Sequence, residues 1–288
     1  MSFTTAQLAL IKDGHALSAD LSSRIKHAFG LSKRKVEPKR HHYIASPPGA
    51  GKTFTVQAIA NQYKIPLLKI QGVASMSNLV TRIAVAIYSL DAGESLIVWV
   101  DDCDSIFMDR DTLNVMKGVL DEERNVLAYN KNMSMQIMQY EKSDIKGDHL
   151  KAEALRSFQQ PGSVGVEVPT DQLRFIITSN KALAAPNSEL RTAIKMNEAA
   201  IHDRVNYREY KLTPQKSWGW IASVLLDNDL LDITTSQKEI LLKFMYANWE
   251  RLSSTSMRKV QELAAMMINN PRTYRSEWNL ELRDEVHA

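Results

Sequence analysis

The sequence predicts an α/β fold in which helices flank a mostly parallel sheet. Three observations carry this prediction. From residue 41 to about residue 211, short apolar segments alternate with segments of helical periodicity. Leu96–Val100 is a continuous apolar run, as expected of a strand buried on both faces. A loop rich in glycine and proline, Ser46–Gly51, separates the first strand of this region from its first helix.

The predicted elements follow in chain order. Residues 1–40 form an N-terminal extension with helical patterning over 5–12 and 18–29. The α/β region, residues 41–212, has strands at 43–45, 66–70, 96–100, 173–178 and 205–211 and helices at 52–63, 77–90 and 109–120. An insertion near 121–171 is interpreted as a hairpin with a mobile tip, with strands at 126–129 and 164–168. A helical domain, residues 213–288, has helices at about 215–228, 234–250 and 255–269.

Composition excludes several classes of protein. The 288 residues carry a net charge of +3, and 44% are hydrophobic, which is typical of a globular protein. The basic segment Lys33–His42 is either a solvated linker or a phosphate contact, and the remaining chain is about neutral. The single cysteine, Cys103, excludes a disulfide framework and a multi-cysteine zinc site. With no long apolar span and no leader pattern, we expect a cytoplasmic protein without a membrane partner.

The loop Ser46–Thr53 reads Ser-Pro-Pro-Gly-Ala-Gly-Lys-Thr and predicts a phosphate-binding loop. Its glycines let backbone N–H groups approach phosphate oxygens, and the following helix adds partial positive charge. Lys52 is the candidate for the β- and γ-phosphates, and Thr53 for Mg²⁺. Ser46 departs from the glycine that usually begins this pattern. The other predicted nucleotide-binding residues of this segment are Pro48, Gly49, Ala50, Gly51 and Phe54.

Two later strands end in polar residues that suit phosphate chemistry. Asp101 follows the apolar run and is the candidate for holding Mg²⁺, while Asp102 is the candidate for orienting or deprotonating water. Asn180 follows the strand at 173–178 and can place a neutral amide between the acids and the γ-phosphate. Alternatively, Asn180 is an ordinary turn residue with no role in catalysis.

These motifs resemble Walker A, Walker B and sensor 1 of the AAA+ ATPases, a family of P-loop NTPases with a helical lid. The segment Ala200–Val205 is similar to the family's arginine-finger segment, with Arg204 as the candidate and Arg191 as its rival. Ser256–Val260 resembles sensor 2, with Arg258 as the candidate. The resemblance covers Tyr43–Asn270. It implies ATP and Mg²⁺ as cofactors, a finger acting on the neighbouring subunit's nucleotide, and a ring or spiral, commonly a hexamer.

One residue departs from the family. Most members have Glu after the Walker B Asp, whereas Asp102 is one methylene shorter. We therefore expect slow hydrolysis or dependence on a partner protein. The short N-terminal extension and the segment Leu113–Leu120 are similar to bacteriophage-encoded members, which would place the protein in the host cytoplasm.

The leading function hypothesis is an ATP-driven motor in nucleic-acid metabolism, such as a replication-associated ATPase or helicase loader. The insertion near 121–171 mixes acids with five cations, a pattern typical either of a solvated face or of a surface that contacts phosphates. The cations are Lys131, Lys142, Lys146, Lys151 and Arg156. The first alternative is a protein-remodelling chaperone that grips its substrate with Val73 or Met76, in the loop Gln71–Ser77. The second is an oligomeric scaffold gated by ATP.

Overall fold

The computed structural model describes residues 3–31, 39–71, 75–91, 94–102, 110–186, 192–227 and 231–282. The chain divides into two compact units. One contains residues 1–24, 46–56 and 210–288, and the other contains residues 25–45 and 57–209. Helices α1 (Thr5–Ala28) and α2 (Lys52–Tyr63) contribute residues to both units. The expected pair of N-terminal helices is thus one continuous helix.

The unit that contains residues 57–209 is built on a parallel sheet, which confirms the α/β prediction. Its five strands have the order β2-β3-β6-β1-β7. Because neighbouring strands in this sheet run parallel, each connection must cross over to the same end of the sheet, and helices lie in these crossovers. The strands are β1 (His42–Ala45), β2 (Leu67–Gln71), β3 (Leu96–Asp101), β6 (Leu173–Ser179) and β7 (Asn206–Glu209).

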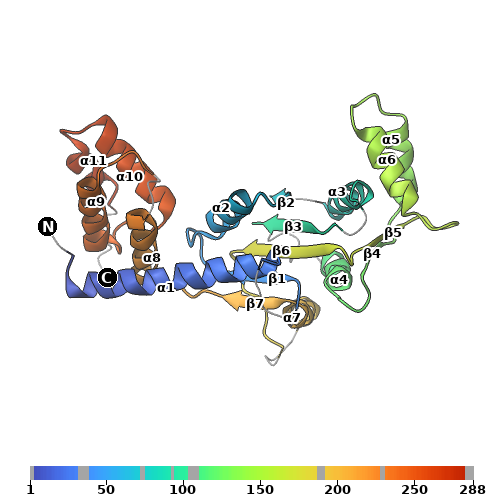
Figure 1. Ribbon diagram of the computed structural model, residues 1–288, viewed down its shortest axis with the longest axis horizontal. Helices are drawn as coiled ribbons and strands as arrows, with labels where there is room; N and C mark the ends of the chain where they lie inside the picture. The colour runs from blue at the N-terminus through green and yellow to red at the C-terminus, as the bar shows by residue number, and fades with distance from the viewer. Residues whose placement is uncertain are drawn as a thin grey trace. The chain divides into compact units, whose positions relative to one another are not determined.

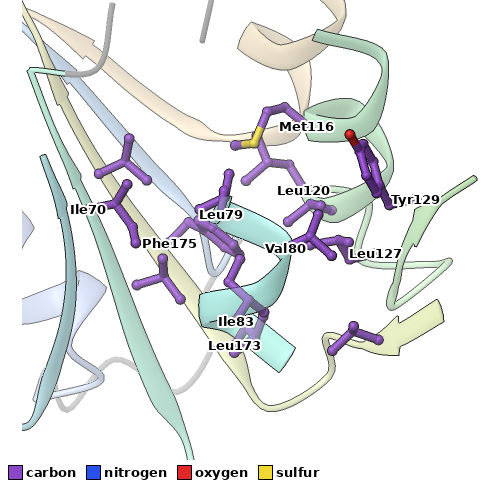
Figure 2. Packing of buried hydrophobic residues seen from close by; sticks show 14 of the residues in the cluster. Ile70, Leu79, Val80, Ile83, Met116, Leu120, Leu127, Tyr129, Leu173 and Phe175 are labelled. Atoms are coloured by element: carbon purple, nitrogen blue, oxygen red, sulfur yellow. The ribbon is translucent and has the colours of Figure 1, made fainter. Parts of the chain in front are cut away.

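The core of this unit lies against one face of the sheet. Helix α3 (Met76–Tyr88) is capped by Ser75, whose hydroxyl accepts the backbone N–H of Asn78, and it buries Leu79 and Ile83. Figure 2 shows these side chains meeting residues of β2, β6 and α4 (Arg110–Val119). Each fully buried Leu or Ile contributes about 1.5–3 kcal/mol to the stability of the fold. This packing therefore stabilises the sheet, including the carboxyl end of β3, where Asp101 lies.

The insertion differs from its prediction. Strands β4 (Val126–Tyr129) and β5 (Val166–Pro169) form the expected antiparallel ladder. Between them lie two helices, α5 (Met133–Glu141) and α6 (Asp148–Ser157), where a hairpin with a mobile tip was expected (Figure 1). Helix α5 is capped by Asn132, whose side chain accepts the N–H of Met135, and it buries Met133 and Ile137.

The unit that contains residues 210–288 is helical in its C-terminal part. Helices α8 (Pro214–Asp227), α9 (Thr235–Asn248) and α10 (Met257–Asn269) confirm the three predicted helices, and α11 (Tyr274–Leu280) adds one that was not predicted. Helix α1 packs closely on α8, since a Cβ added to Gly14 would lie 2.1 Å from the carbonyl oxygen of Gly219. Across the described ranges, every helix is too short or too polar to span a lipid bilayer.

Candidate active site

The predicted phosphate-binding loop runs from the end of β1 to the start of α2. Gly49 and Gly51 have φ angles of +81° and +74°, in the left-handed region that favours glycine. Their freedom lets the loop turn back so that α2 begins at Lys52. Ala50 is buried, whereas Phe54 is exposed in the first turn of the helix. A loop of this form that leads into a helix N-terminus is suited to an anion.

Lys52 is buried, and Ser46 holds its ammonium group. The Nζ atom donates to the carbonyl oxygen and to the hydroxyl oxygen of Ser46, both at 2.9 Å. The serine that departs from the usual pattern therefore supplies an acceptor that glycine lacks. Only 5% of Lys52 is exposed, so its charge depends on these oxygens for solvation.

Residues of the C-terminal helices approach the same loop closely. A Cβ on Gly49 would lie 2.5 Å from the Cβ of Ser256, which caps α10. A Cβ on Gly51 would lie 2.0 Å from Cζ2 of Trp220 in α8. Only glycine fits at either position. The predicted sensor 2 residue, Arg258, is exposed in the first turn of α10, two residues after the cap that contacts the loop.

Asp101 ends β3 with a fully buried carboxylate. Its Oδ1 accepts the hydroxyl of Thr178 at 2.7 Å, and its Oδ2 lies 3.4 Å from Nζ of Lys69. The ammonium of Lys69 also lies 4.3 Å from the ring centroid of Trp99. Sequence reasoning missed Lys69 and Thr178. The signal is the strand register, because Lys69 is opposite Trp99 and Thr178 is opposite Asp101 in neighbouring strands.

Asp102 and Asn180 lie together at the carboxyl edge of the sheet. The Asn180 amide donates to Oδ1 of Asp102 at 3.2 Å, and the Asp102 backbone N–H donates to the carbonyl oxygen of Thr178 at 3.0 Å. Asp102 has a φ of +50°, a conformation that Asp tolerates better than Glu. The backbone therefore gives a physical reason for the shorter acid.

Comparison with protein-family models adds the deciding observation. Residues 42–197, more than half of the chain, match the model described as ATPase family associated with various cellular activities (AAA). The chain belongs to this family. It is an ATPase of the AAA+ class, with the P-loop NTPase fold and a helical C-terminal region. Comparison with curated proteins gave no match.

Two residues of this AAA+ ATPase carry oxygen donors of the type that Mg²⁺ prefers in proteins. The buried Asp101 carboxylate is a hard ligand at the end of β3, and Thr53 carries a hydroxyl in the first turn of α2. The Nζ atom of Lys69 lies 3.4 Å from Oδ2 of Asp101 and places a positive charge beside the buried acid.

Arg204 ends helix α7 (Ala193–Arg204), as the arginine-finger resemblance expects. Its guanidinium donates to Oδ2 of Asp121, with Nη2 at 3.3 Å, and to the carbonyl oxygen of Ala200 at 2.9 Å. Burial opposes ionisation of Asp121, yet the backbone N–H of Glu123 and the Arg204 guanidinium together hold the pKa of Asp121 below its usual value. The rival finger, Arg191, and Cys103 and Val73 lie outside the described residues.

Proposed function

We propose that this AAA+ ATPase hydrolyses Mg²⁺-ATP at sites completed by two copies of the chain. Lys52 and the loop residues 48–54 hold the phosphates, and Arg258 contacts them from the C-terminal helices. Thr53 and Asp101 hold Mg²⁺, while Asp102 orients the attacking water and Asn180 fixes the position of Asp102. The observation that carries the proposal is the bond from Asn180 to Asp102, because it positions an acid that would otherwise rotate in solvent.

Arg204 would act on the nucleotide of a neighbouring copy, in a ring or spiral that is commonly a hexamer. An arginine supplied in this way raises phosphoryl-transfer rates by about 10³–10⁵. Its partial exposure and its position at the end of α7 suit this role. Mixing Arg204→Ala chains with Lys52→Ala chains tests it. Activity that returns in the mixture supports a site shared between copies, whereas an inactive mixture contradicts it.

We further propose that the motor acts on nucleic acid, in the bacteriophage replication setting that the sequence suggests. The helical insertion supports this proposal. Lys151 pairs with Asp148 at 2.7 Å and Arg156 pairs with Glu141, so neighbouring acids balance both charges. Lys131, Lys142 and Lys146, the remaining cations that the sequence analysis singled out, have exposed side chains. They are the candidates for contacting phosphates.

Binding of single-stranded DNA over a range of salt concentrations tests this role. Neutralising Lys131, Lys142 and Lys146 should lower the slope of log affinity against log salt by about 2, since each phosphate contact contributes about 0.7. Neutralising Lys151 and Arg156 is the matched control and should leave the slope unchanged. An unchanged slope in the triple variant contradicts the proposal. Stimulation of ATP turnover by unfolded polypeptide alone would favour the chaperone.

A further inference from the structure

Trp220 lies against the phosphate-binding loop and is almost completely buried, with 1% of its surface exposed. Its Cζ2 and Cη2 atoms lie 2.0 Å and 2.2 Å from where a Cβ on Gly51 would be. The Cε2 atom, which is bonded to Nε1, lies 3.0 Å from the same point. The six-membered ring of the indole therefore lies beside the loop, and Nε1 is one bond away from the Cε2 atom of this ring.

The Nε1–H of Trp220 has no hydrogen-bond partner in the described part of the chain. Three other buried tryptophans provide an internal comparison. The N–H of Trp218 donates to the carbonyl oxygen of Leu242 at 2.8 Å. The indoles of Trp99 and Trp278 likewise donate, to Thr178 and Leu263, each at 2.9 Å. An indole buried to this degree ordinarily finds an acceptor, so the donor on Trp220 is an exception at a functional position.

We infer that the indole N–H of Trp220 donates to a phosphate oxygen of the nucleotide bound at the Ser46–Thr53 loop. This inference rests on the proposed nucleotide site and adds a residue to it. Phosphate oxygens are the acceptors that such a loop binds. A buried N–H gains more free energy from a hydrogen bond to a charged acceptor than from one to a neutral acceptor. Trp220 is thus a nucleotide-binding residue supplied by α8, in addition to Arg258 on α10.

The variant Trp220→Phe keeps an aromatic ring and removes the donor. Calorimetric titration with ATP should give a dissociation constant about fivefold to tenfold higher than that of the unchanged protein. Trp218→Phe is the matched control, because it changes a neighbouring indole of the same helix whose N–H already has an acceptor. Its affinity for ATP should stay within about twofold. Titration with adenosine should not separate the two variants, since adenosine lacks phosphate.

A second measurement uses the unchanged chain and so does not depend on whether a variant folds. In the unchanged chain with ¹⁵N-labelled tryptophan, the Nε1–H resonance of Trp220 should move downfield on addition of ATP, and that of Trp218 should not. An unmoved Trp220 resonance, or equal ATP affinity in Trp220→Phe and the unchanged chain, would overturn the inference. Failure of the unchanged chain to bind ATP is a separate result, which would overturn the proposed function itself.

Discussion

The ammonium of Lys52 lies 2.9 Å from the hydroxyl oxygen of Ser46, the residue that replaces the usual first glycine of the loop. In the proposed site, a bound phosphate competes with this hydroxyl for the ammonium. Ser46→Ala removes the hydroxyl and leaves the carbonyl contact in place, so we expect ATP to bind about threefold more tightly. Ser46→Thr keeps a hydroxyl and should bind as the unchanged chain does. Equilibrium titration with ATP measures both, and weaker binding by Ser46→Ala would contradict the competition.

Asp102 is expected to set the rate of hydrolysis. Asp102→Asn keeps the side-chain shape but loses the charge that orients water, so turnover should fall about 10²–10⁴-fold while ATP still binds. Asp102→Glu restores the usual family acid at a φ of +50°, which should destabilise the protein by about 1 kcal/mol without raising turnover. Phosphate release and urea denaturation measure these effects. Full turnover in Asp102→Asn would exclude it as the acid.

Asp121 is expected to restrain the arginine finger. The ion pair within one chain, at 3.3 Å, competes with the contact that Arg204 would make to a neighbouring nucleotide. Asp121→Asn should therefore raise turnover about threefold at a fixed protein concentration, because a neutral amide binds guanidinium less strongly. Glu122→Gln, one residue along the same turn, should leave turnover unchanged. A fall in turnover in Asp121→Asn would show that the pair instead positions the finger.

The fold followed from apolar runs and loop chemistry, and helix α2 spans Lys52–Tyr63 as predicted. Helix α6 was missed because its segment is mostly polar, and α5 was missed because its apolar residues are mainly scattered methionines, of which the helix buries Met133 together with Ile137. The phosphate-loop residues, the two acids and Asn180 could be predicted as candidates because each ends a strand or comes directly after one. The partners Lys69 and Thr178 were not, since their contacts depend on register between strands far apart in sequence.

The contact between α1 and α8 should be sensitive to a single methyl group. A Cβ on Gly14 would meet the backbone of Gly219 at 2.1 Å, so Gly14→Ala should destabilise the protein by about 1–3 kcal/mol. Gly118→Ala is the control in α4, where the nearest atom to the added Cβ is 3.9 Å away. It should be neutral or stabilise the protein by up to about 1 kcal/mol, because alanine favours helix. Calorimetric unfolding measures both, and equal effects would contradict the close approach.

His41 should make stability depend on pH. Burial and the nearby charge of Arg40 lower the pKa of His41 from 6.5 to about 3, and its Nδ1 accepts the backbone N–H of Phe175 at 3.1 Å. The unfolded chain therefore binds a proton more readily between these two values. The free energy of unfolding should fall by up to about 1.4 kcal/mol for each pH unit below 6.5. His41→Asn should lose this dependence in urea denaturation between pH 5 and pH 7, and an unchanged slope would contradict the assignment.

The most direct test of the shared ATPase site is phosphate release from Mg²⁺-ATP at rising concentrations of the purified chain, with Lys52→Ala as the blank. The specific rate should increase with protein concentration, because each site needs Arg204 from another copy, and Lys52→Ala should show no release. A specific rate that does not change with protein concentration, although the chain associates over the same range, would contradict the shared site. Equal release by the unchanged chain and Lys52→Ala would contradict the ATPase site itself.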